Sequence, residues 1–186
     1  MKNTFRKFDD LFINLINAKI KNKYLDTFMY RITDLGGAIF ITVFSLSLVI
    51  FGSTNNKLIG VEAIFALIVS QIVVHSLKRL LSRERPYKII EQLNTYGIDL
   101  SDYSFPSGHT TASFSLATTL ALNLPRIYII VYLFAILIAI SRIYLGVHYP
   151  TDVAAGILLG IGGAIVVHFY MIKYVEQFAV FIGIIK

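Results

Sequence analysis

Long apolar stretches separated by short polar segments dominate the chain from residue 36 onward. About 20 apolar residues in a helix, at about 1.5 Å per residue, cross a hydrocarbon core of roughly 30 Å. The pattern predicts five such spans, at residues 36–52, 58–77, 107–124, 127–143 and 152–172. In the last span, the small residues of Gly156-x-x-x-Gly160 would let a neighbouring helix approach closely. Strand-like alternation and internal repeats are absent, so we predict an all-α, polytopic transmembrane helical bundle.

The first 35 residues have a mixed pattern instead of an apolar one. Lysine and arginine residues separate apolar side chains at helical spacing, which are Phe5, Phe8, Leu11, Phe12, Leu15 and Ile16. Such a pattern is typical of an amphipathic helix lying in the membrane interface. A plain helix packed on the spans fits equally well, and a poor sixth span would raise the count from five to six. We therefore expect an N-terminal amphipathic or interfacial segment at 1–35 and a membrane-embedded domain at 36–186.

The composition supports a membrane protein. The 186 residues are 56% hydrophobic and only 15% charged, whereas soluble domains carry roughly 25% charged residues. The net charge of +6 suits membrane anchoring, anionic headgroups or an anionic ligand. Dispersed basic residues and the lack of tryptophan argue against nucleic acid, and the lack of cysteine removes thiolate chemistry. We expect membrane lipids as partners, no nucleic acid and no obligatory protein partner.

Polar residues converge on one face of the predicted bundle. The second span ends at the polar segment 78–106, the third begins there, and the fourth returns to the same side, so the loop 144–151 lies beside that segment. Each cluster alone has an ordinary explanation, such as snorkelling cations or a capping serine. Together they bring cations, a helix N-terminus and two histidines to one place. The clusters are Lys78, Arg79, Arg83 and Arg85, then Ser107, Gly108 and His109, then Ser141, Arg142, His148 and Asp152.

Five of these residues suit the binding of a phosphate group. Lys78, Arg85 and Arg142 supply positive charge, and the arginines add planar pairs of donors that match phosphate oxygens. A helix that begins at Ser107 and Gly108 offers free backbone N–H groups and the positive end of its dipole.

Three more residues suit attack on that phosphate. Asp152 follows His148 by four positions, so its carboxylate can fix the tautomer of the imidazole and leave the other ring nitrogen as a nucleophile. His109 is then available as the general acid for the leaving oxygen. Acidic residues near these positions are too few and too dispersed for a metal cage, so we expect no metal and no cofactor.

These residues resemble the signature of the type 2 phosphatidic acid phosphatases, also called lipid phosphate phosphatases. The signature has three blocks, which stand here in order and without substitution across residues 78–152. They are Lys78-x6-Arg85-Pro86, Pro106-Ser107-Gly108-His109 and Ser141-Arg142-x5-His148-x3-Asp152. One block would be a weak signal, whereas three in order are specific. The family also includes soluble acid phosphatases and vanadate haloperoxidases, against which the apolar spans argue.

The resemblance implies a metal-independent membrane phosphatase that hydrolyses a lipid phosphate or diphosphate, of the phosphatidate, phosphatidylglycerophosphate or undecaprenyl diphosphate type. In such enzymes the histidine matching His148 becomes phosphorylated, Asp152 orients it, and His109 protonates the leaving group. The matching phosphate-binding positions are Lys78, Arg85, Ser107, Gly108 and Arg142. A lipid-linked phosphotransferase with the same site and a non-catalytic lipid carrier or transporter are the alternatives.

Two observations predict opposite orientations of the site in the membrane. Apart from the expected phosphate-binding cations, ten lysine and arginine residues fall on the side of the site and four on the other. The positive-inside rule would then turn the site toward the cytoplasm. Bacterial proteins that this chain resembles generally carry the site outward. We expect a multi-pass protein of the cell membrane with an outward-facing site.

Overall fold

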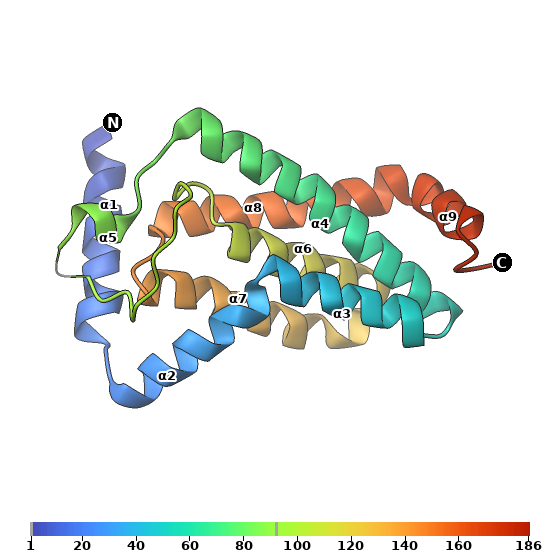
Figure 1. Cartoon of the computed structure of the whole chain (residues 1–186), viewed down its shortest axis with the longest axis horizontal. Coiled ribbons are helices and arrows are strands. Elements are labelled where there is room, and N and C mark those ends of the chain that lie inside the picture. Colours follow the sequence, from blue (N-terminus) through green and yellow to red (C-terminus); the bar gives the residue numbers. More distant parts are fainter. Residues whose placement is uncertain (1, 92) are drawn as a thin grey trace.

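The computed structural model describes residues 2–91 and 93–186, and these residues form helices and loops without any strand (Figure 1). Nine α-helices lie within these two ranges. They are α1 (Lys2–Asn14), α2 (Lys23–Ile32), α3 (Ala38–Phe51), α4 (Thr54–Leu81), α5 (Pro86–Ile89), α6 (Gly108–Asn123), α7 (Tyr128–Tyr144), α8 (Pro150–Val166) and α9 (Ile172–Phe181). The π-helical turns Leu15–Lys19 and Val167–Met171 extend α1 and α8, and the 3-10 turns Thr33–Gly36 and Pro125–Ile127 lead into α3 and α7.

Helix α6 lies at the centre of the bundle and contacts α3, α4, α7 and α8. The long helices run along the bundle, α1 crosses one of its ends beside α5, and α9 lies at the other end (Figure 1). Many buried residues of α6 are small or carry a hydroxyl group. Hydroxyl groups such as those of Thr111 and Thr119 donate to carbonyl groups four residues back in their own helix, so α6 buries them at little cost.

The surface of the bundle suits a lipid environment. Within the described residues, three helical segments are long and apolar enough to cross a membrane, namely Thr54–Ile89, which joins α4 and α5, Pro125–Tyr144 and Pro150–Phe181. A fourth candidate is the pair Lys23–Gly36 and Ala38–Phe51, which is bent by 56°. Large apolar side chains such as Ile39, Phe51 and Leu158 are more than 70% exposed, as expected where lipid replaces water. The all-helical membrane fold is thus confirmed in the described ranges, while the count of five or six spans stays a prediction.

The predicted first span, 36–52, differs in detail from the structure. It is the second arm of the bent pair, because the chain turns at Gly36 and Gly37, where α3 begins in an extended N-cap residue. A Cβ atom at Gly36 would overlap the side chain of Ile138 in α7. Glycine therefore lets this bend pack against α7 at the end of the bundle where the site was expected.

The N-terminal segment consists of two helices. Asn22 separates them, since its side-chain oxygen accepts hydrogen bonds from the backbone N–H groups of Tyr24 and Leu25 at the start of α2. Helix α1 buries Asp9 and Ile13 and leaves apolar side chains exposed, including Phe8, Leu11 and Phe12. Met1 and the side chains of residues 2–5 and 18 lie outside the described part. The division at residues 35 and 36 and the interfacial position of this segment stay predictions.

Helices α6 and α8 approach closely through the small residues predicted for this purpose. A Cβ atom at Gly160 would overlap the carbonyl oxygen of Thr111, and one at Gly156 would lie 2.8 Å from the carbonyl oxygen of Ser107. Gly162, on another face of α8, has nothing within 4 Å of its Cβ position. The contact of α6 with α8 therefore depends on Gly156 and Gly160.

This packing predicts different outcomes for two glycine substitutions in α8. Gly160→Ala should destabilise the protein by about 1–3 kcal/mol, because the added methyl group meets the backbone of α6. Gly162→Ala should change stability by less than about 1 kcal/mol, with the sign set by the better helix propensity of alanine. Thermal unfolding of both variants in detergent measures the difference, and equal midpoints would contradict the close contact.

Candidate active site

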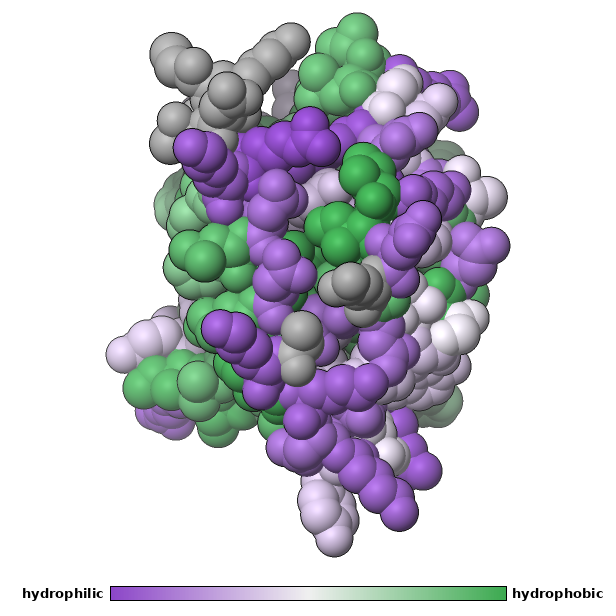
Figure 2. All heavy atoms as spheres, turned by 90° about the vertical axis from the view of Figure 1, so that its left-hand side faces the viewer, coloured by the Kyte–Doolittle hydropathy of each residue, from purple (hydrophilic) through white to green (hydrophobic). Residues whose placement is uncertain are grey.

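The N-termini of α6 and α8 meet at the end of the bundle that α1 crosses. Ser107 is the N-cap residue of α6, and its side-chain oxygen accepts a hydrogen bond from the N–H of Thr110. The N–H of Ser107 donates to the carbonyl oxygen of Asp152 in the first turn of α8, at 3.0 Å. Figure 2 shows that hydrophilic side chains gather on this end of the molecule. The contact between α6 and α8 therefore also brings two of the predicted motif blocks together, the block that contains Ser107 and the block that ends at Asp152.

A cavity of about 190 Å³ lies at this end and brings the three blocks together. Six of the eight predicted site residues line it, and they are Lys78, Arg85, Gly108, His109, Arg142 and His148. The other two, Ser107 and Asp152, are fully buried next to it. Within the described residues, no group of three or more histidine or acidic side chains is arranged to hold a metal ion. The side chains of Lys78, Arg85 and Arg142 bring positive charge to the cavity.

The loop between α7 and α8 places His148. Gly146 adopts φ +66° just beyond the end of α7, and this left-handed turn lets the N–H groups of Val147 and His148 donate to the carbonyl oxygen of Arg142. His148 is only 1% exposed. Its Nε2 lies 3.2 Å from Nη1 of Arg85, on the cavity side.

The other ring nitrogen of His148 faces Asp152. The distance from Nδ1 to Oδ2 of Asp152 is 3.6 Å, and Nδ1 has no hydrogen-bond partner among the described residues. Burial lowers the pKa of His148, and the charges of Arg142 and Arg85 lower it further. The imidazole is therefore held in its neutral form, which a nucleophilic nitrogen requires.

Histidine 109 approaches the cavity from another direction. It is the second residue of α6, it is half-buried, and it lines the cavity together with His148. The backbone N–H groups of the first turn of α6 lie next to it. His109 and Gly108 at the start of α6 therefore line the same cavity, while the binding of an anion there stays a prediction.

The cations around the cavity have partners that the sequence analysis missed. Nζ of Lys78 lies 2.7 Å from Oδ2 of Asp102, and Nη2 of Arg85 lies 2.5 Å from Oδ1 of the same carboxylate. Nη1 of Arg142 donates to the hydroxyl of Thr33, at 2.7 Å. No signal in the sequence singled out Asp102 for this pairing, because the same segment also carries Glu84, Glu91 and Asp99.

The side chain of Asp102 reaches the cavity from the loop before α6 and is 53% exposed. Partial burial raises the pKa of Asp102, but the hydrogen bond from Lys78 and the charges of Arg85 and Lys78 outweigh burial and hold this pKa below its ordinary value. The carboxylate thus stays ionised at neutral pH. It engages two of the cations expected to bind a phosphate.

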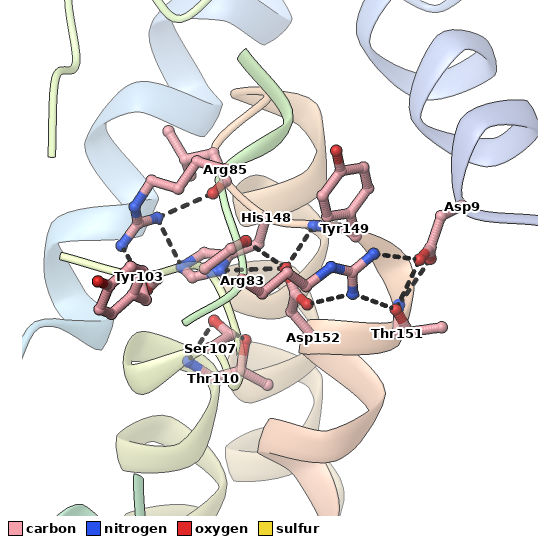
Figure 3. A network of polar contacts seen from close by, with 12 residues as sticks. Asp9, Arg83, Arg85, Tyr103, Ser107, Thr110, His148, Tyr149, Thr151 and Asp152 are labelled. Carbon is pink, nitrogen blue, oxygen red and sulfur yellow. Dashed lines mark hydrogen bonds and ion pairs between the residues drawn. The ribbon is translucent and has the colours of Figure 1, made fainter. Parts of the chain in front are cut away.

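Arg83 lies outside the cavity, although the sequence placed it in the same basic cluster. Ser82 ends α4, and Arg85 is extended just before α5 begins, so both arginines lie in the short segment between these two helices. Arg85 reaches His148, whereas Arg83 reaches Asp152 and, beyond it, Asp9 of α1 (Figure 3). Neither Arg83 nor Asp9 was among the site residues predicted from the sequence.

Several known proteins are similar to this chain. It is 36% identical over 115 residues to the bacitracin transport permease protein BcrC of Bacillus licheniformis, covering 62% of this chain and 57% of that protein. Over 114 residues it is 33% identical to an undecaprenyl-diphosphatase of Sulfolobus acidocaldarius, covering 61% of this chain and 54% of that one. The match therefore spans little more than half the length of these curated relatives.

Solved structures share the fold along most of this chain and most of their own. The crystal structure of LpxE from Aquifex aeolicus superposes with a TM-score of 0.78 at 33% identity, covering 87% of this chain and 95% of that one. A PAP2-type phosphatidylglycerolphosphate phosphatase from Bacillus subtilis gives a TM-score of 0.73 at 26% identity, covering 94% and 87%. The sequence model of the PAP2 superfamily matches residues 59–175, which contain all three motif blocks. The chain therefore belongs to the PAP2 superfamily.

Proposed function

We propose that this protein is a membrane phosphatase that hydrolyses a lipid phosphate or diphosphate through a phosphohistidine intermediate. The observation that carries the proposal is the cavity in which His148 and His109 face three cations. The names of similar proteins add support, since they include an undecaprenyl-diphosphatase, a lipid A 1-phosphatase and a phosphatidylglycerolphosphate phosphatase.

The phosphate group binds at the cations and at the start of α6. Lys78, Arg85 and Arg142 neutralise its oxygens, and the backbone N–H groups of Gly108 and His109 at the start of α6 donate to it. All three cations are at most 6% exposed, so their attraction for an anion is weakly screened by water. Charge on the transferred phosphoryl group is thus stabilised by fixed side chains, and the reaction proceeds without a metal ion.

The chemistry has two steps. Nε2 of His148 attacks phosphorus, the bond from phosphorus to the lipid-side oxygen breaks, and His109 gives that oxygen a proton. Asp152 orients the imidazole and stabilises the positive charge that develops on it. In the second step water attacks the phosphohistidine, His109 accepts a proton from the water, and inorganic phosphate leaves.

The cavity opens on the outer side of the cell membrane in this proposal. The bacterial family that the motifs resemble supports this orientation, while the greater number of basic residues on the side of the site opposes it.

Hydrolysis of a panel of lipid phosphates by the purified protein in detergent tests the function. We expect phosphate release that survives a chelator and falls by roughly 10³-fold or more in His148→Ala, as expected for loss of a nucleophile. His168→Gln is the matched control, because it removes a histidine near the opposite end of the bundle and keeps a hydrogen-bonding group for Glu62. Normal turnover in His148→Ala, or a magnesium requirement, would contradict the mechanism.

Removing the charge of Asp102 should strengthen inhibition by inorganic phosphate. In Asp102→Asn, Lys78 and Arg85 lose the carboxylate that engages them, and phosphate no longer competes with it. We expect the inhibition constant to fall by up to roughly fivefold, since a half-exposed ion pair contributes about 1 kcal/mol at most. Asp99→Asn, in the same loop, is the control. An unchanged or higher constant in Asp102→Asn would indicate that Asp102 holds the cations in place instead.

A single cysteine in the loop 89–103 tests the orientation, because the chain has no cysteine of its own. A membrane-impermeant thiol reagent should label this cysteine in intact cells. Labelling only after lysis would mean that the site faces the cytoplasm, as the distribution of basic residues suggests.

A further inference from the structure

The carboxylate of Asp152 is completely buried and is held by more than the histidine it faces. Its Oδ1 accepts a hydrogen bond from Nη1 of Arg83, at 2.6 Å. Its Oδ2 accepts hydrogen bonds from the hydroxyl of Ser104 and from the N–H of Tyr149, and it is also the oxygen that faces His148. Because a buried carboxylate is costly without a positive partner, the contact with Arg83 is central to this arrangement.

Arg83 itself is fixed on several sides. Nη1 also donates to the hydroxyl of Thr151, at 2.8 Å, and Nη2 donates to Oδ2 of Asp9, at 2.7 Å. The guanidinium carbon lies 4.0 Å from the centre of the Tyr149 ring, within the range of a cation–π contact. These contacts leave the guanidinium group little freedom to rotate, so it presents Nη1 to Asp152 in one orientation.

Asp9 reaches this network from α1, far away in the sequence. Its Oδ1 accepts a hydrogen bond from the N–H of Thr151, at 3.0 Å, and its Oδ2 accepts one from the hydroxyl of Thr151, at 2.7 Å. The N–H of Thr151 is one of the free donors in the first turn of α8, so Asp9 also caps the helix that carries Asp152. Figure 3 shows Asp9, Arg83 and Asp152 in a row, ending at His148.

We propose that Arg83 and Asp9 are positioning residues of the active site: Arg83 holds the carboxylate of Asp152 toward His148, and Asp9 holds Arg83. The N-terminal helix α1 thereby completes the site. This inference rests on the proposed function, in which Asp152 orients the nucleophile. Neither Arg83 nor Asp9 lines the cavity with the two histidines, so both act through Asp152 and not on the phosphate.

The two carboxylate oxygens of Asp152 have different partners, and this difference explains why Arg83 is important. Arg83 occupies Oδ1, which leaves Oδ2 turned toward Nδ1 of His148, at 3.6 Å. Without Arg83 the carboxylate loses its only salt bridge to a lysine or arginine within the described residues. A small rotation or displacement of Asp152 then changes the direction of the imidazole, and a shift of about 1 Å at a reacting group can cost about 100-fold in rate.

Steady-state kinetics of Arg83 variants test the first step. Arg83→Gln should lower kcat on the order of 100-fold and leave KM and inhibition by phosphate within about twofold, because the phosphate-binding cations are untouched. Arg83→Lys should recover part of the loss, since it restores the charge. Arg79→Gln is the matched control, an exposed arginine four residues earlier. A kcat for Arg83→Gln equal to that of Arg79→Gln would overturn the proposal.

Variants of Asp9 test the second step. Asp9→Asn keeps an acceptor for the N–H of Thr151 but no longer pairs with Arg83, and we expect a loss in kcat of roughly tenfold, which corresponds to about 1.4 kcal/mol. The double variant with Arg83→Gln should be no slower than Arg83→Gln alone, because Asp9 acts through Arg83. Asp10→Asn makes the same charge change one position further along α1 and should leave kcat unchanged. Additive losses in the double variant would overturn this step.

Nuclear magnetic resonance of the histidine rings separates this proposal from the proposed function. The chain has only four histidines, so the His148 signals can be assigned with His148→Ala. In ¹⁵N-histidine-labelled protein in detergent, Arg83→Gln and Asp9→Asn should shift the Nδ1 signal of His148, while Arg79→Gln and Asp10→Asn should not. This shift is expected even if the protein hydrolyses no lipid phosphate. A lack of hydrolysis would refute the proposed function and would leave the positioning role intact. An unchanged Nδ1 signal in Arg83→Gln would overturn the positioning role.

Discussion

The burial of charge at one end of an apolar bundle is the constraint to which the rest of this structure responds. Lys78, Arg85 and Arg142 are at most 6% exposed, and an isolated charge in such a place costs several kcal/mol. Two of them form salt bridges, since the carboxylate of Asp102 contacts both Lys78 and Arg85. Arg142 has a hydroxyl partner in Thr33 and no salt bridge within the described ranges. An anion in the cavity would therefore find positive charge that the protein has not neutralised.

The position of this charge depends on how closely two helices pack. Glycines of α8 allow contact with the backbone of α6, and the N–H of Ser107 then bonds the carbonyl oxygen of Asp152 where both helices begin. The start of α6, where an anion is expected to bind, and the residues around His148 are consequently held by the same contact. The geometry of the site thus depends on how α6 and α8 pack inside the membrane. Helix α1 is a third element of the site, because its Asp9 accepts a hydrogen bond from Arg83.

Much of this arrangement could be predicted from the sequence. Apolar runs gave the helical membrane fold, and their predicted ends differ by one residue from those of α6 and α7. Motif spacing predicted eight site residues, and the structure places six of them around one cavity and the other two buried next to it. These features could be predicted because a helix, its apolar face and a motif of fixed spacing each depend on residues that are close together in the sequence.

The partners of those residues could not be predicted in the same way. Asp9 contacts Thr151 across 142 positions, and Thr33 contacts Arg142 across 109, so only the folded arrangement reveals which acid or hydroxyl each one meets. The 56° bend between Gly36 and Ala38 was also not predicted, because both glycines there were assigned to the start of a straight span at 36–52. Asn22, a strong helix N-cap residue, was the overlooked local signal that the N-terminal segment contains two helices.

In the proposed reaction, His148 forms a covalent bond to phosphorus. Mixing purified protein with a lipid phosphate labelled at phosphorus, stopping the reaction in alkali within milliseconds and mapping the label by mass spectrometry tests this claim directly. We expect an acid-labile, alkali-stable phosphoryl group on the peptide that contains His148, and no label on His148→Ala. A label on another residue, or hydrolysis that proceeds with no labelled protein at any time, would contradict it.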